Sequence, residues 1–280
     1  MPDELLTLQA PVPVDLTTRA SAAVCTEREQ DPAGSMAIDE MQARPSLPLL
    51  HEDVTAGAER AERLLPLARM LTATTLRTLT REAGVPSAVL RPALTRLGSV
   101  RHIKPDVELR DNASVYYQDP RTIRFGTLFL AGLRADEAVI SVLAHELTHA
   151  ADGSRTSLAP LFRAVAQRAA RATRTRIVGH RAEELTCDLV GVLVARAYIA
   201  RTPSVEPFAR RTARAVEHNC VTRDETDLAH LSPRRTLSTL LALEPTFARE
   251  ITGEQAAAEP TPALHRRPRR AAAAHATPRR

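Results

Sequence analysis

The residues best suited to chemistry form the run His145-Glu146-Leu147-Thr148-His149, which lies inside an apolar stretch. On a helix, positions four apart lie on one face, one turn from each other. Both imidazoles can therefore offer a nitrogen to one tetrahedral zinc ion at about 2.0–2.1 Å. Glu146 projects about 100° away on such a helix, beside the metal without binding it. From there it can take a proton from a water molecule that the zinc activates.

A catalytic zinc ion needs a third protein ligand and one open position. In the metzincin pattern the third ligand is a histidine six residues after the second, and Arg155 stands there, which excludes that arrangement. The later run of residues 183–191 places Glu184 and Asp188 on one helical face. Glu184 can be the third ligand, and Asp188 can accept the spare N–H of a liganding histidine.

Asp188 lies in an otherwise apolar run, where a charge needs a partner. Gly191 and Ala195 continue the face of Glu184 and Asp188. Their small side chains predict that this helix approaches the helix of the histidines closely. Cys187, on the same helix, is interpreted as a small buried residue rather than as a ligand.

The two motifs together, HExxH and a later Glu-x-x-x-Asp, resemble those of the gluzincin metallopeptidases. Most similar is the family of HtpX and the CAAX prenyl protease, whose second motif commonly has alanine where Cys187 stands. The resemblance covers about residues 106–200 and, weakly, 232–243. It implies a zinc-dependent endopeptidase in which His145, His149 and Glu184 bind the metal. Glu146 is then the general base and Asp188 an outer partner of a histidine.

The family often has a His-Pro step near the transition-state oxyanion, and here Ser232-Pro233 takes that place. His230 and Arg235 flank this step and are the candidates for stabilising the oxyanion. Two tyrosines are further candidates, although we expect them to pack in the core; they are Tyr116 and Tyr117. The family's membrane-embedded members have transmembrane helices, and no apolar run here reaches that length. The resemblance therefore does not extend to prenylated or membrane substrates.

The helices and strands that must position these residues can also be predicted from the sequence. They form an α+β, mostly helical, zincin-like domain with a small β-sheet before the HExxH helix. A helical pattern begins near residue 56, and a second helix follows Pro86 and ends near Gly98. Short strands are expected at 107–109, 114–118 and 122–125. Further helices are expected at about 136–151, 158–174, 181–200 and 233–250. Because zincins commonly add an extended peptide to a sheet edge, we predict Thr122–Phe125 as that edge.

Composition divides the chain into three parts. Residues 1–55 form an acidic arm predicted to be disordered, 56–252 the metallopeptidase domain, and 253–280 a basic, disordered tail rich in Ala, Pro and Arg. The net charge is +5, and the acidic arm precedes a basic body. The arm can therefore shield the cleft electrostatically. In a sharper version, a thiolate of Cys25 fills the open position of the zinc.

Cysteine usage and targeting signals bear on the compartment. The three cysteines, Cys25, Cys187 and Cys220, are odd in number and widely spaced, so they predict no disulfide framework and fit a reducing compartment. Neither a signal peptide nor a membrane-spanning stretch is apparent. We therefore expect a cytoplasmic protein that does not insert into membranes.

The leading hypothesis is a zinc-dependent endopeptidase that acts on peptides or proteins. One alternative is a dedicated regulatory or toxin-like metalloprotease with a single protein target, which differs only in the breadth of its substrates. Another is an Arg-rich, nucleic-acid-associated protein with a non-catalytic zinc site. The basic body favours that reading only weakly, and we do not expect nucleic acid as a partner.

Overall fold

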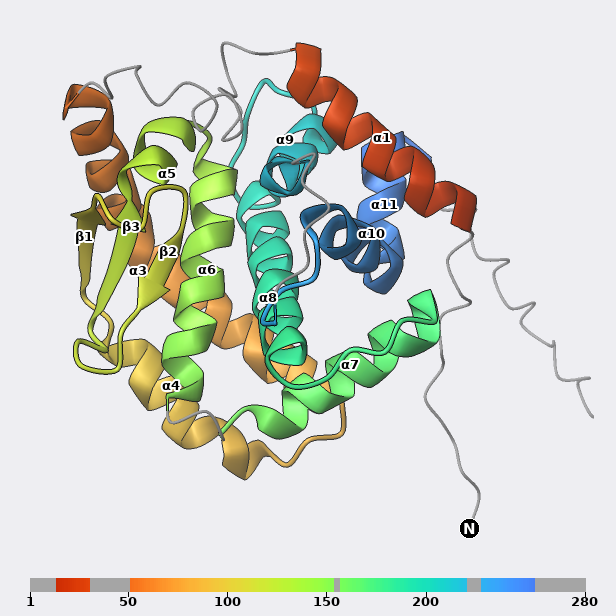
Figure 1. The fold of residues 1–280 in the computed structure, drawn as a ribbon. Coiled ribbons are helices and arrows are strands. Elements are labelled where there is room, and N and C mark those ends of the chain that lie inside the picture. Colours follow the sequence, from red (N-terminus) through yellow and green to blue (C-terminus); the bar gives the residue numbers. More distant parts are fainter. Residues whose placement is uncertain (1–13, 31–50, 154–156, 221–227, 255–280) are drawn as a thin grey trace, which may run out of the picture.

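The computed structural model describes residues 14–30, 51–153, 157–220 and 228–254. It is mostly helical with one small sheet, in agreement with the α+β prediction (Figure 1). The α-helices are α1 (Val14–Gln30), α3 (His51–Glu82), α4 (Leu90–Ser99), α5 (Thr127–Gly132), α6 (Asp136–Asp152), α7 (Ala159–Thr173), α8 (His180–Ile199), α9 (Phe208–Arg214), α10 (Pro233–Leu243) and α11 (Pro245–Thr252). The described part also contains the 3-10 helices η1 (Ser87–Val89) and η2 (Glu217–Asn219) and the strands β1 (His102–Asp106), β2 (Ala113–Val115) and β3 (Thr122–Gly126).

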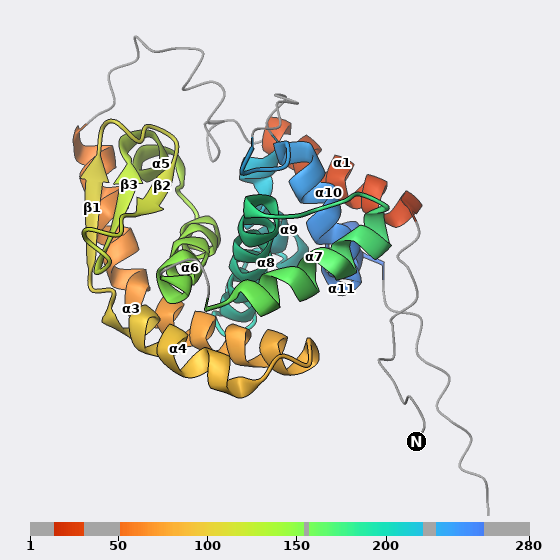
Figure 2. The same cartoon turned by 60° about the horizontal axis from the view of Figure 1, so that its bottom comes forward.

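Helices α6 and α8 run side by side through the middle of the molecule (Figures 1 and 2). The sheet, α3 and α5 lie on the α6 side, whereas α10, α11 and α1 lie on the α8 side. The core is built mostly from Leu, Val, Ile and Ala. The two central helices are thus covered on both sides, and most side chains on their facing surfaces are buried.

The sheet has the strand order β1-β3-β2, with β1 parallel and β2 antiparallel to β3. The prediction that Thr122–Phe125 is an edge strand is therefore wrong, because β3 is paired on both sides. The edge that faces α6 is β2. The strand expected at 107–109 is a turn, and the strand expected at 114–118 is shortened to Ala113–Val115.

The helices predicted at 136–151, 158–174 and 181–200 are present within one residue of their expected bounds, and a helix after Pro86 is present as α4. The helix expected from near residue 56 begins earlier, at His51, and continues through Pro66. The helix expected at 233–250 is two helices, broken at Glu244, whose backbone is not helical, with φ −123° and ψ 77°. Proline disfavours helical geometry in the residue before it, and Pro245 therefore explains the break.

Part of the N-terminal arm is ordered, contrary to the prediction of disorder for 1–55. Val14–Gln30 forms α1, which packs across α9, α10 and α11 and buries Leu16, Ala20 and Val24. The predictions for residues 1–13, 31–50 and 255–280 lie outside the described residues. Among the helices that the structure describes, none is both long and apolar enough to cross a membrane.

A disulfide joins Cys25 on α1 to Cys220 just after η2. The cysteine pattern predicted no such bond, because the two residues are 195 positions apart. The bond also removes the suggested role of a Cys25 thiolate as a zinc ligand. Disulfides form and persist in oxidising surroundings, so this bond is at odds with the reducing compartment that the sequence analysis expected.

Reduction of this disulfide should destabilise the folded chain by about 2–4 kcal/mol, because the bond closes a long loop in the unfolded state. Urea unfolding with and without a dithiol reductant measures the difference. The variant Cys25→Ser should match the reduced wild type and should not respond to the reductant. Equal unfolding midpoints for oxidised and reduced wild type would show that the bond contributes nothing.

Candidate metal centre

The end of α6 is held in place by an arginine from α4. The guanidinium of Arg96 donates to the carbonyl oxygens of Ala151 and Asp152 at 2.7 and 3.2 Å. A cation at this position satisfies the last carbonyl groups of the helix and complements its dipole. Gly153 ends the helix with φ 66°, and an added Cβ would lie 2.5 Å from the Arg96 side chain. Gly153 therefore caps the helix one turn beyond the second histidine.

Helices α6 and α8 approach closely at Gly191, as the small residues on α8 predicted. A Cβ at Gly191 would lie 2.7 Å from the carbonyl oxygen of Ser141 and 3.0 Å from its Oγ. Ala195, one turn later, is fully buried. Any larger residue at Gly191 would push the helices apart, and with them the acidic groups of α8 and the histidines of α6.

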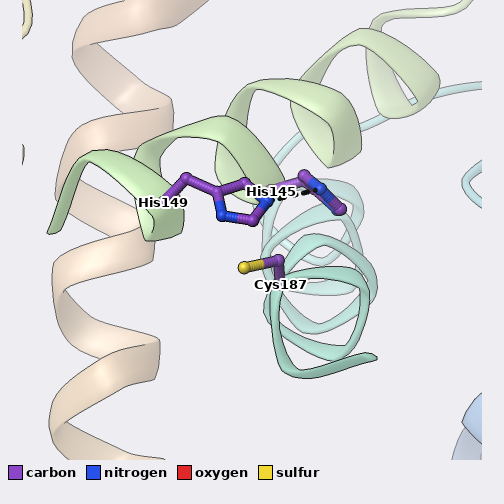
Figure 3. A group of neighbouring side chains, drawn as sticks. All are labelled: His145, His149 and Cys187. Carbon is purple, nitrogen blue, oxygen red and sulfur yellow. Dashed lines mark hydrogen bonds between the residues drawn. The ribbon is translucent and has the colours of Figure 1, made fainter. Parts of the chain in front are cut away.

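Three donor atoms converge between these helices. The Nε2 atoms of His145 and His149 are 3.1 Å apart, and Oε2 of Glu184 lies 3.2 Å from each of them. Figure 3 shows the two imidazoles turned toward each other from consecutive turns of α6. Four ligands at about 2.0–2.1 Å around a tetrahedral ion are separated by about 3.3 Å. The triangle of donors therefore has the size that a zinc ion requires.

Each histidine has its own carboxylate on the opposite ring nitrogen. Oδ1 of Asp188 lies 2.8 Å from Nδ1 of His145, and Oε1 of Glu183 lies 3.1 Å from Nδ1 of His149. Asp188 was predicted to be such an outer partner, whereas Glu183 was overlooked. The signal was present in the sequence, because two liganding histidines need two outer partners and the run 183–188 offers three acids.

When both imidazoles are neutral, this arrangement leaves the centre of the triangle without a proton. A carboxylate at Nδ1 selects the tautomer with hydrogen on Nδ1, so that each Nε2 presents a lone pair. Two lone pairs and a carboxylate oxygen then face one another at 3.1–3.2 Å. Such a group of acceptors repels itself unless a positive charge lies among them.

The pKa shifts of His145, His149 and Glu184 also show that positive charge is favoured at this site. Burial lowers the pKa of His145, but the hydrogen bond and charge of Asp188, and then Glu184, raise it well above its usual range. Burial likewise opposes a charge on His149, but its pKa is raised by Cys187 and then by the hydrogen bonds to Glu183 and Glu184. Burial raises the pKa of Glu184, but hydrogen bonds from both histidines outweigh it and lower that pKa. The acidic groups would stabilise a divalent cation in the same way.

Glu146 lies beside the triangle without belonging to it. Its Oε1 is 4.0 Å from Nε2 of His145, and its side chain is only 6% exposed. Burial raises its pKa above the usual range for a glutamate, although both histidines act in the opposite direction. The carboxylate nevertheless reaches the surface of a cavity, where it can meet a water molecule or a substrate.

A cleft of about 410 Å³ opens onto Glu146 and His145. Its walls come from both sides of the central helices and combine polar groups with an apolar part, which is formed by Phe129, Val142, Val192, Leu231, Pro233 and Leu240. Its rim on the sheet side is formed by Asp111, Asn112 and Ala113, at the start of the edge strand β2. The cleft thus joins the donor triangle to an unpaired strand edge and an apolar wall.

The two candidates for stabilising an oxyanion differ in position. His230 lines the cleft, with Nε2 3.5 Å from Oε2 of Glu184. Arg235 is exposed on α10 and is not among the residues that line the cleft, so the structure does not bring it to the site. Tyr116 and Tyr117 are also outside the cleft lining, and with exposures of 38% and 57% they do not pack in the core as expected.

The thiol of Cys187 lies close to both histidines. The sequence analysis interpreted Cys187 only as a small buried residue and did not anticipate this proximity. Its Sγ and one nitrogen from each of His145 and His149 all lie within 4.8 Å of one another (Figure 3). Oε2 of Glu184 lies 3.2 Å from the Nε2 atoms of both histidines, and we therefore regard Glu184 as the third ligand of the triangle. Burial raises the pKa of the Cys187 thiol, with the two histidines opposing.

Removing either outer carboxylate should weaken zinc binding by about 10–100-fold, as losses of such partners usually do. Asp188→Ala releases the Nδ1 hydrogen bond of His145, and Glu183→Ala releases that of His149. Competition with a chromophoric chelator measures the zinc affinity of each variant. Glu52→Ala, an exposed change at the start of α3, is the matched control. Wild-type affinity in Asp188→Ala would contradict the assigned role.

The chain was compared with protein-family models, with curated proteins and with solved structures, and none of these comparisons found a match. Its chemistry is therefore argued from the geometry of His145, His149, Glu184 and their neighbours.

Proposed function

We propose that this protein is a zinc-dependent peptidase of the gluzincin type, with His145, His149 and Glu184 as metal ligands and Glu146 as general base. The observation that carries the proposal is the triangle of three acceptors with edges of 3.1–3.2 Å. Its nitrogen and oxygen donors suit zinc, and its dimensions match tetrahedral coordination. Three protein donors leave one position open, which is the pattern of catalytic rather than structural zinc sites.

In this proposal the side chains around the triangle have separate roles in hydrolysis. When bound, a zinc ion supplies Lewis-acid activation of water and of a carbonyl oxygen. Glu146 takes the proton of the attacking water and passes it to the leaving amine. Asp188 and Glu183 hold the imidazoles in the tautomer that presents Nε2. His230 lines the cleft and can carry a positive charge. It is therefore placed to stabilise the developing oxyanion.

The cleft supports a peptide substrate in extended form. Among the strands described, β2 pairs with β3 alone, so its other edge can add a peptide through backbone hydrogen bonds. Ala113 at its start lines the cleft that leads to Glu146. The apolar wall formed by residues such as Phe129 and Leu240 suits a large apolar side chain beside the scissile bond.

A second candidate function rests on Cys187. A fourth protein donor would close the coordination shell, and closed shells are typical of structural zinc sites. In that case the zinc would hold α6 against α8, and the protein would be a binding module rather than an enzyme. The burial of Glu146 next to an open cleft favours the catalytic reading, because a structural site has no use for a base there.

Metal content and proteolysis, measured on the full chain, test the proposal. We expect one zinc ion per chain, cleavage of unstructured peptides beside large apolar residues, loss of cleavage after chelation, and its return with added zinc. His149→Ala should lose both zinc and cleavage. An absence of bound zinc at saturating concentration, or cleavage that survives complete chelation, would overturn the proposal.

A further inference from the structure

The side chain of Cys187 has more polar surroundings than a space-filling residue needs. It is fully buried on α8, three residues after Glu184 and four after Glu183, so that all three share the face toward α6. Its Sγ points to the imidazoles of His145 and His149 (Figure 3). An alanine would occupy this place without burying a sulfur among charged groups. The thiol therefore stands where a metal donor would stand.

The thiol and the cleft reach the donor triangle from different directions. His145 and Glu146 line the cleft, whereas Cys187 does not and is closed off from solvent. A water molecule or substrate therefore arrives from the cleft, and the sulfur arrives from the interior of the helix pair.

We propose that Cys187 is a fourth protein donor of this centre, which gives the metal site a closed form beside the open form that hydrolysis requires. The inference rests on the proposed metal site. In the closed form the sulfur, at about 2.3 Å, completes the four ligands of the metal and leaves no position open for water. The cation class follows from the donors: two imidazoles, a carboxylate and a thiol select thiophilic divalent ions such as Zn²⁺, Co²⁺ and Cd²⁺ over Mg²⁺ and Ca²⁺.

The closed form holds the enzyme latent while the metal stays bound. Opening requires only that the metal exchange the sulfur for a ligand in the cleft, with the thiol keeping its place between the helices. A substrate that enters along β2 supplies its carbonyl oxygen as the ligand that replaces the sulfur. Cys187→Ala should therefore keep the cation and hydrolyse peptides faster than the wild type does, because the competing donor is gone.

Cobalt spectroscopy tests this inference with a readout other than activity. The metal-free full chain is titrated with Co²⁺, which reports tetrahedral coordination in the visible range and a sulfur ligand by charge-transfer absorption in the near ultraviolet. We expect both signals in the wild type. Cys187→Ala should lose the charge-transfer band completely and keep the tetrahedral bands, and Cys187→Ser serves as a second variant of similar size should the alanine variant unfold.

The double variant Cys25→Ser/Cys220→Ser is the matched control, because it leaves Cys187 as the single cysteine of the three in the chain. It should keep the charge-transfer band in full. Stoichiometric tetrahedral Co²⁺ without that band in the wild type would overturn the role of Cys187 while leaving the metal site in place. A chain that binds no Co²⁺ would overturn this inference together with the proposed function.

Discussion

Glu146→Gln should retain the fold and one zinc ion per chain but lose about 10²–10⁴-fold in the turnover of peptides. The amide has the shape of the carboxylate but cannot take a proton from water. The fold should tolerate the change, because Glu146 is buried and burial already raises its pKa, so that a neutral side chain removes a desolvated charge. Zinc analysis, circular dichroism and initial rates on one peptide measure the three properties together.

The matched control is Glu59→Gln, the same chemical change at an exposed position of α3. It should leave zinc content and rate unchanged. If Glu146→Gln turns over peptide at the wild-type rate, the proton transfer assigned to Glu146 is wrong, although the metal site can still stand. If the variant loses its zinc, Glu146 acts on the metal rather than on water.

The second large effect concerns the buried ion pair that ties α9 to the start of α6. Nε of Arg211 lies 2.6 Å from Oε1 of Glu137, and their side chains are 7% and 6% exposed. Arg211 also donates to the carbonyl oxygen of Thr202 at 2.6 Å. Arg211→Ala leaves the carboxylate buried without its charge partner, which should cost about 3–5 kcal/mol of unfolding free energy.

The double variant Glu137→Gln/Arg211→Met separates the loss of a partner from the value of the pair. Replacing both members of a buried pair often costs little, so we expect the double variant to be more stable than Arg211→Ala. Urea unfolding of the three proteins measures both differences. A loss below about 1 kcal/mol in Arg211→Ala would indicate that water reaches Glu137, as at an exposed pair.

The helices of the candidate site were well predicted from the sequence, because their signals are local. Two residues four apart share a helical face whatever the rest of the chain does. That rule placed His145 with His149 and Glu184 with Asp188. The glycine at 191 predicted the close approach of the two helices, which the structure confirms through its contact with Ser141.

Strand order and cysteine pairing were predicted wrongly, because they depend on residues far apart in the chain. The strand Thr122–Gly126 looks like an edge only until β1 pairs with it from one side and β2 from the other. Cys25 and Cys220 come together across 195 residues, which no spacing rule anticipates. The ordered α1 has the same origin, since its burial depends on helices near the other end of the chain.

The amino-acid sequence by itself determined the chemical types at the candidate site and the faces on which they lie, because helix periodicity relates neighbours a few residues apart. Only the tertiary structure decided which acid approaches the Nε2 atoms of the two histidines and which acids contact their Nδ1 atoms. Glu183 and Glu184 are adjacent in sequence, yet they contact opposite nitrogens of His149. The relative placement of α6 and α8 makes that distinction, and it likewise places the thiol of Cys187 beside both histidines.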